Sequence, residues 1–283
     1  MPERWTPLGC DCQARHFSLC FEYDQPVAGE IVFAHGRQGN YRREVHRCGL
    51  CGHFIELHDF DDSDLYAHDY VDATYGDSEG MRRAFERVMA LDESRSDNAG
   101  RVRNVLDVFD RHAGGRMAPG RAPSVLDVGS GLCVFLHRMK AAGWDCTALD
   151  VDPRQAEHAE RVAGVRALCA DFLTTDQLGR YDLITFNKVL EHVNDPVSML
   201  AHAAGRLRAG GLVYVEVPDG EAAMAEGRER EEFLLGHRHV FSAASLCLLV
   251  ERAQFRLTEL QRLREPSSKF TLRAFLVPAA PAA

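Results

Sequence analysis

Two glycines and a neighbouring carboxylate form the first candidate binding site in the sequence. Gly129 and Gly131 directly follow the apolar segment 124–128, and Asp127 lies two residues before the first glycine. Glycine permits the tight turn that joins a strand to a helix, and it lets a ligand approach bare backbone amides. The spacing therefore predicts a binding site for a nucleotide-type cofactor.

The residues after this turn discriminate between two cofactor classes. A dinucleotide fingerprint G-x-G-x-x-G that starts at Gly129 requires glycine at position 134, where the chain has Val134. An NAD-type oxidoreductase therefore remains only as an alternative. A carboxylate at Asp127 suits the ammonium group of an amino-acid-bearing nucleoside, which favours S-adenosylmethionine (SAM). A strand-turn-helix without any ligand is the simpler interpretation that this motif alone leaves open.

Each of the next three apolar segments ends in a polar side chain. The first of these side chains follows the glycine turn by roughly twenty residues, where a carboxylate can bind both ribose hydroxyls. Ligands bind beyond the carboxyl ends of parallel strands, so these side chains are expected to lie at one cleft. In chain order they are Asp150, Asp171 with the adjacent Phe172, and Asn187. Asp152 is instead expected to cap the helix that begins at Pro153.

The elements that must position these residues follow from the hydrophobic pattern. Leu132, Phe135, Leu136 and Met139 repeat at helical spacing after the first strand. Four strand-helix units in a row predict a Rossmann-like α/β fold, in which helices cover both faces of a mostly parallel sheet. A further helix is expected to end at Gly210 and Gly211, before a strand over 212–217, and the charged segment 226–232 is expected to be mostly solvated helix. Alternating segments over 255–263 and 270–278 complete a seven-stranded sheet with an antiparallel hairpin.

These motifs resemble those of the class I SAM-dependent methyltransferases. The family motif D-x-G-x-G-x-G matches from Asp127, with Cys133 in place of the third glycine, and the family string V-L-E-H-V occurs at 189–193. The resemblance implies that Asp150 binds the ribose, that Val151 packs on the adenine and that Asp171 binds the adenine amino group. The cofactor-binding residues are expected to be Asp127, Gly129, Gly131, Asp150, Val151, Asp171, Phe172 and Asn187.

A histidine is the candidate catalytic base. The string G-H-R-H-V-F-S at 236–242 resembles the E-H-x-x-Y-F-S string of sugar methyltransferases, in which the histidine is implicated in deprotonating the substrate. His237 occupies that position, although Gly236 and Val240 replace the glutamate and the tyrosine. A histidine with a pKa near neutrality is the right chemical type for this step. His192 is an alternative base or a structural residue, and His239 is expected to cap or pack.

Five of the nine cysteines lie within the first 51 residues. In a cytosolic chain, such a cluster favours a metal site over disulfides. Cys48-Gly49-Leu50-Cys51 has the spacing of a zinc knuckle. We expect a structural zinc ion held by Cys10, Cys12, Cys48 and Cys51. Replacement ligands that remain open are Cys20, His46 and His53, and a set of metal-free thiols is the simpler alternative.

The composition limits the function. The chain has 283 residues, with 46% hydrophobic and 27% charged residues, which is ordinary globular usage. A formal net charge of -9 argues against nucleic acid as a partner. No apolar run approaches a membrane span, and the N-terminus lacks a signal-peptide core, so a cytoplasmic protein is expected.

Three segments are expected along the chain. They are a cysteine-rich zinc-binding module at 1–65, a helical linker or lid at 66–115 and a SAM-dependent methyltransferase domain at 116–283. The predicted function is methyl transfer to a small molecule such as a nucleotide-linked sugar or related saccharide, with the acceptor atom open among oxygen, carbon and nitrogen. A noncatalytic SAM-binding or zinc-scaffold protein is the other alternative.

Overall fold

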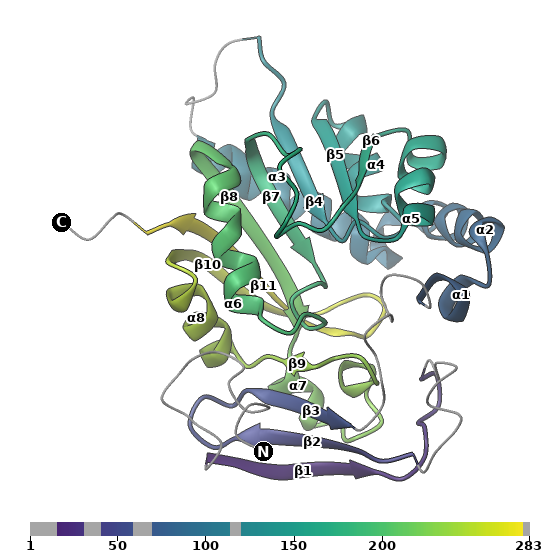
Figure 1. The fold of residues 1–283 in the computed structure, drawn as a ribbon, viewed down its shortest axis with the longest axis vertical. Helices are drawn as coiled ribbons and strands as arrows, with labels where there is room; N and C mark the ends of the chain where they lie inside the picture. The colour runs from purple at the N-terminus through teal and green to yellow at the C-terminus, as the bar shows by residue number, and fades with distance from the viewer. Residues whose placement is uncertain (1–15, 31–40, 59–69, 114–119, 280–283) are drawn as a thin grey trace.

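The protein contains one large sheet covered by helices and one smaller sheet that lies at one end of the strands of the large sheet (Figure 1). The computed structural model describes residues 16–30, 41–58, 70–113 and 120–279. The large sheet has seven strands and the small sheet has four. Among the described residues, no helix is long and apolar enough to cross a membrane.

The large sheet has the strand order β10-β11-β8-β7-β4-β5-β6. Neighbouring strands run parallel from β8 to β6, whereas β11 is antiparallel to both β8 and β10. The predicted seven-stranded, mostly parallel sheet with a final antiparallel hairpin is therefore confirmed. Its strands are β4 (Ser124–Val128), β5 (Asp145–Asp150), β6 (Arg166–Cys169), β7 (Tyr181–Asn187), β8 (Leu207–Pro218), β10 (Phe255–Arg264) and β11 (Phe270–Pro278).

Helices cover both faces of this sheet and enclose two apolar cores. One core lies between the sheet and the pair α6 and α8, with Leu200, Leu246 and Leu249 from those helices. The other lies under α2, α3 and α4, with Phe85 and Phe109. The helices are α1 (Tyr70–Tyr75), α2 (Ser78–Met89), α3 (Asp97–Ala113), α4 (Val134–Ala141), α5 (Pro153–His158), α6 (Pro196–Ala203), α7 (Gly220–Met224) and α8 (Ala243–Arg252).

Two sequence predictions of helix are wrong. Gly210 and Gly211 do not end a helix, because α6 stops at Ala203 and the glycines lie inside β8. Gly210 has φ +76°, and the pairing register with β7 shifts at this point, so the glycines form an irregularity in the strand.

The charged segment 226–232, expected to be a solvated helix, is instead mostly irregular. Only Glu231–Phe233 forms a short 3-10 helix, after Gly227 at φ +108°. Glu232 is buried there, since its carboxylate accepts hydrogen bonds from Arg230 and from the backbone N–H of Phe270. The many charged residues in this segment suggested that Glu232 would be exposed to solvent, but these two hydrogen-bond donors allow its carboxylate to be buried.

The small sheet joins the N-terminal region to the rest of the chain. Its order is β1-β2-β3-β9, and all of its pairings are antiparallel. The fourth strand comes from far along the sequence and lies directly before α8. The strands are β1 (Phe17–Tyr23), β2 (Arg43–Cys48), β3 (Phe54–His58) and β9 (His239–Val240). The predicted boundary between the first and second segments falls at residues 59–69, outside the described residues.

Candidate functional site

A cleft of about 620 Å³ lies beyond the carboxyl ends of β4, β5, β6 and β7. This volume is within the usual range for sites that bind small molecules. The cleft is lined by every residue predicted to bind the cofactor and also by the candidate base His237. One continuous cavity therefore connects the predicted cofactor end with the segment before β9.

The glycine turn between β4 and α4 forms one wall of the cleft. Gly129 has φ +68°, and a Cβ atom placed on it would lie 2.8 Å from Cγ2 of Val189. Cys133, at the position of the third motif glycine, also has a left-handed backbone, with φ +59°. Its side chain is buried in the core around α4. The turn requires a conformation that favours glycine at Cys133, although the chain carries a thiol there.

Asp127, at the end of β4, is buried at the cofactor end. Its Oδ1 accepts hydrogen bonds from Oγ1 of Thr185 at 2.6 Å and from Nδ2 of Asn187 at 2.7 Å. Burial is the main reason why the pKa of Asp127 is raised to about 7, and the two hydrogen bonds oppose that shift. Within the described residues, Oδ1 of Asn187 has no hydrogen-bond partner. Both residues therefore present acceptor atoms suited to an ammonium group.

Asp150 lies on the opposite side of the glycine turn. Its two oxygens accept hydrogen bonds from the backbone N–H groups of Gly131 at 3.1 Å and Asp152 at 3.2 Å. Burial raises the pKa of Asp150 to about 6, against these hydrogen bonds. Asp152 caps α5 by accepting from the N–H of Arg154, as the sequence predicted. The carboxylate of Asp150 is thus held at the turn, where its oxygens can also accept hydrogen bonds from the two hydroxyls of a diol.

The remaining predicted cofactor residues line the far wall. Val151 is 43% exposed and lines the cleft, where its side chain is accessible to a flat base. Asp171 is exposed, and its carboxylate accepts from the N–H of Leu173 at 2.6 Å. Phe172 is buried and packs edge-to-face on Phe186. The structure therefore places Val151 and Asp171 at the cleft surface and Phe172 mainly beneath it.

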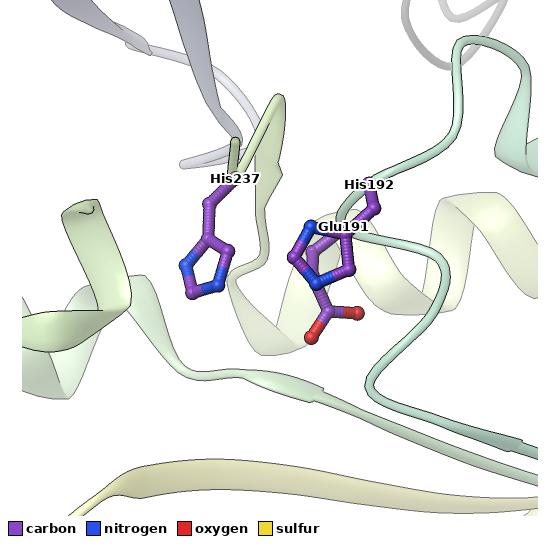
Figure 2. Close-up of side chains that lie close together, drawn as sticks. All are labelled: Glu191, His192 and His237. Carbon is purple, nitrogen blue, oxygen red and sulfur yellow. The ribbon is translucent and has the colours of Figure 1, made fainter. Parts of the chain in front are cut away.

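Glu191, His192 and His237 meet at the other end of the cleft (Figure 2). Nδ1 of His192 lies 2.7 Å from the carbonyl oxygen of Gly236. Nδ1 of His237 lies 2.8 Å from the carbonyl oxygen of Glu232. Carbonyl oxygens only accept, so Nδ1 carries the proton in both rings and Nε2 carries the lone pair. Burial lowers the pKa of His192 to about 4 and that of His237 to about 3. Both imidazoles are therefore neutral at neutral pH.

The small sheet holds the segment that carries His237. The Glu56 carboxylate accepts from the N–H of Gly236 at 3.0 Å, and the Glu56 N–H donates to the carbonyl of Arg238 at 3.1 Å. Arg43, fully buried, donates to the carbonyl of Phe233 at 2.5 Å and forms an ion pair with Glu56 at 2.8 Å. Strands β2 and β3 thereby fix the backbone on both sides of the histidine.

A charged cleft residue that was not predicted is Arg101 of α3, which is held by a buried carboxylate behind the cleft. Glu216, on the buried strand β8, forms ion pairs with Arg101 of α3 and with Arg273, and these cations lower its pKa against the effect of burial. Lys188, directly after β7, also lines the cleft, as the strand-end position of its segment suggested. A charged residue inside an otherwise apolar strand was a signal in the sequence for Glu216. Its partners could not be identified, because they lie on other elements.

The predicted zinc ligands are only partly described. Cys48, the last residue of β2, and Cys51, in the turn that follows, are both buried, whereas Cys10 and Cys12 lie outside the described residues. Cys20 packs against a different apolar cluster, around Tyr23. Within residues 16–30, 41–58, 70–113 and 120–279, the grouping of three ligand side chains that could hold a metal is that of Glu191, His192 and His237.

The two alternative histidine ligands are engaged elsewhere. Nε2 of His46 lies 2.8 Å from the carboxylate of Glu44. His53 is fully buried between Oγ of Ser245, at 3.2 Å, and Nδ1 of His239, at 3.1 Å. His239 is buried and therefore packs within the core, which is one of the two roles expected for it.

The sequence is similar to known methyltransferases. A protein-family model described as a methyltransferase domain matches residues 73–260. The ubiquinone biosynthesis O-methyltransferase of Bordetella avium (strain 197N) is 36% identical over 98 residues, which cover 32% of this chain and 40% of that protein. The enzyme of the same name from Acinetobacter baylyi is 31% identical over 117 residues, covering 38% and 48%. The chain thus spans less than half the length of these curated relatives.

Solved structures share the fold. The magnesium protoporphyrin IX methyltransferase from Synechocystis PCC 6803 with bound SAH superposes with a TM-score of 0.56 at 13% identity, covering 77% of this chain and 100% of that one. The 1,6-didemethyltoxoflavin-N1-methyltransferase of Burkholderia thailandensis gives a TM-score of 0.52 at 20% identity, covering 84% and 96%. The family match, the strand order and the glycine turn agree, and they set aside the oxidoreductase alternative: the chain belongs to the class I SAM-dependent methyltransferases.

Proposed function

We propose that the cleft binds SAM and that the protein transfers its methyl group to a small-molecule acceptor. The observation that carries this proposal is the single cleft that joins the glycine turn to the neutral histidines. When bound, SAM supplies a methyl group on a sulfonium that is already a good leaving group. The residues of this chain would mainly align the acceptor and take up its proton.

The cofactor end divides into three groups of contacts. Asp127 and Asn187 would hold the ammonium group through their acceptor oxygens, and Asp150 would hold the ribose hydroxyls beside the turn at Gly129 and Gly131. Val151, with Asp171 and Phe172, would contact the adenine. Calorimetry of SAM binding tests this assignment: Asp127→Ala and Asp150→Ala should each weaken binding strongly, whereas unchanged affinity in both variants contradicts it.

His237 is the proposed proton acceptor. Its Nε2 carries the lone pair, because Nδ1 donates to the carbonyl of Glu232. Burial keeps the imidazole neutral at neutral pH, so this lone pair is available without a prior deprotonation. The proton would move to Nε2 as the acceptor atom bonds to the methyl group. A pKa of about 3 makes the free imidazole a weak base, so the transfer would occur together with methyl transfer rather than before it.

The proposed acceptor is a nucleotide-linked sugar or related saccharide. Support comes from the histidine string before α8 and its resemblance to the sugar methyltransferases. A hydroxyl acceptor of another small molecule is the second candidate, favoured by the named relatives, which are O-methyltransferases. Methyl transfer from radiolabelled SAM to a panel of nucleotide sugars and of hydroxylated aromatic compounds separates the two.

The same assay tests the role of the histidine. His237→Ala should lower kcat by roughly 10²–10⁴-fold without weakening SAM binding. His112→Ala is a matched control, since His112 lies on α3 outside the cleft and contacts the carbonyl of Gly210. Equal activity of both variants contradicts the proton-acceptor role. Binding of SAM without transfer to any member of the panel, and without a change in cellular products in His237→Ala, favours a noncatalytic protein.

For the N-terminal region we propose a structural zinc ion. Cys48 and Cys51 fit such a site, because both thiols are buried at the turn that follows β2, where the N–H of Gly52 bonds back to the carbonyl of Cys48. Cys10 and Cys12 are the proposed further ligands. Metal analysis of protein purified without added zinc should find about one equivalent of zinc per chain at this site, and Cys48→Ser should lower the zinc content by about that amount. Less than about half an equivalent in wild type contradicts the site.

We also propose that the chain has three parts, which are a zinc-binding module at 1–65, a helical lid at 66–115 and the methyltransferase domain at 116–283. Tyr75 of α1 and Val88 of α2 line the cleft, which supports a covering role for the second part. The strand pairing of β3 with β9 supports a role for the first part in shaping the acceptor end.

A further inference from the structure

The inference concerns the acceptor end of the cleft and goes beyond the proposed methyl transfer. We propose that Glu191, His192 and His237 form a binding site for one divalent transition-metal ion. The three side chains come from two segments that are far apart in the sequence, the loop after β7 and the loop before β9. Each offers one ligand atom, and these atoms lie within 4.8 Å of one another.

The histidines are oriented as metal ligands usually are. In metal sites, the imidazole nitrogen that does not bind the metal donates its proton to a carbonyl or carboxylate, which fixes the tautomer and the ring orientation. His192 and His237 both have this arrangement, with Nδ1 donating to the carbonyls of Gly236 and Glu232. The two ring centroids lie 5.0 Å apart, with the ring planes inclined by 55°, and the ligand atoms of both rings border one small space (Figure 2).

The carboxylate of Glu191 provides the second, independent observation. Glu191 is fully buried, and neither of its oxygens has a hydrogen-bond partner among the described residues. A buried carboxylate without a partner is costly, so it is normally paired, protonated or bound to a metal. Among the described residues Glu191 forms no ion pair, although Lys188 and Lys269 line the same cleft. Lys269 is paired with Glu231 at 3.1 Å.

The ligand set indicates the class of ion. Two neutral imidazoles and one carboxylate suit Mn²⁺, Fe²⁺, Co²⁺ or Zn²⁺, whereas Mg²⁺ and Ca²⁺ prefer oxygen ligands alone. Three protein ligands leave coordination positions open, and the cleft is the space into which they open. An acceptor oxygen could occupy one of these positions. Metal binding and proton acceptance use the same lone pair on His237, so the two roles exclude one another in any one molecule.

Titration of the chelator-treated full-length protein with Mn²⁺, followed by electron paramagnetic resonance, tests the site. Mn²⁺ prefers oxygen and nitrogen ligands to thiolates, so the N-terminal cysteines do not compete for it. We expect about one bound Mn²⁺ per chain. Glu191→Gln and His237→Ala should each weaken binding at least about tenfold. His112→Ala should bind Mn²⁺ like the wild type.

Two further measurements keep the test decisive. SAM binding by each variant, measured by calorimetry without metal, reports whether the cleft is intact. Electron spin-echo modulation of the bound Mn²⁺ in wild type should contain ¹⁴N signals from imidazole, which needs no variant. Three results would each overturn the metal site. They are no Mn²⁺ binding by the wild type, bound Mn²⁺ without ¹⁴N signals, and Mn²⁺ affinity that is unchanged in both Glu191→Gln and His237→Ala. If SAM still binds, the proposed function survives; loss of SAM binding in wild type contradicts that function instead.

Discussion

Acidification should weaken SAM binding through Asp127. This carboxyl group is buried, and burial raises its pKa to about 7. The ammonium group of the cofactor requires the ionised carboxylate, so binding should strengthen as the pH rises through 7. The stability of the cofactor-free protein should change in the opposite direction. A carboxyl group whose pKa is raised in the folded state costs stability as the pH rises from its unfolded value towards the folded one.

The size of the effect on binding follows from the ionised fraction. With a pKa of about 7, Asp127 is about 3% ionised at pH 5.5 and about three quarters ionised at pH 7.5. If only the ionised form binds, the affinity rises about 25-fold between these pH values, or about 1.9 kcal/mol. Asp150, whose pKa is raised to about 6, adds a smaller change in the same direction.

Isothermal titration calorimetry of SAM binding at pH 5.5 and 7.5 measures this change. Asp127→Asn keeps the shape of the side chain and removes its charge. The variant should bind more weakly at pH 7.5 and should lose most of the pH dependence, retaining only the part due to Asp150. Equal affinities of the wild type at the two pH values, or the same pH dependence in Asp127→Asn, would refute the reasoning.

Three substitutions probe the surroundings of the cleft. Gly129→Ala should cost about 1–3 kcal/mol in urea unfolding and weaken SAM binding, because the added Cβ would lie 2.8 Å from a valine methyl at φ +68°; Gly205→Ala, with open space around it, is the control. Glu216→Gln should destabilise the protein by about 3–5 kcal/mol, since Arg101 stays buried without its counter-charge; a loss below about 1 kcal/mol contradicts this. Glu56→Ala should speed amide exchange in the segment that carries the cleft histidine, because the N–H of Gly236 loses its acceptor. Glu56→Gln, which still offers an acceptor oxygen, should restore much of the protection. Equal exchange in both variants would argue against this role of Glu56.

The strands and the cofactor end of the cleft were largely predictable from the sequence. Strand ends such as Asp127 and Asp150 follow from short apolar segments, and parallel strands bring their carboxyl ends to one edge of a sheet. The local motif at Gly129 is sufficient to define the turn. These features depend on residues that are close together in the sequence, and the same is true of the cap at Asp152.

The acceptor end could not be predicted to the same degree. The meeting of Glu191 and His192 with His237 depends on how two distant loops approach each other, and local periodicity does not contain that information. The lowered pKa of His237 arises from burial, which the string around it does not reveal. The fourth strand of the small sheet was also missed, since β9 has only two residues, His239 and Val240.

Binding of SAM by the full-length wild-type protein tests the central claim most directly. Calorimetry at pH 7.5, with NADH titrated in parallel, should give one SAM site per chain and no NADH binding. The Asp150→Ala variant should bind SAM much more weakly, because the carboxylate that would hold the ribose is removed. No detectable SAM binding by the wild type, or binding of NADH in its place, would contradict the account.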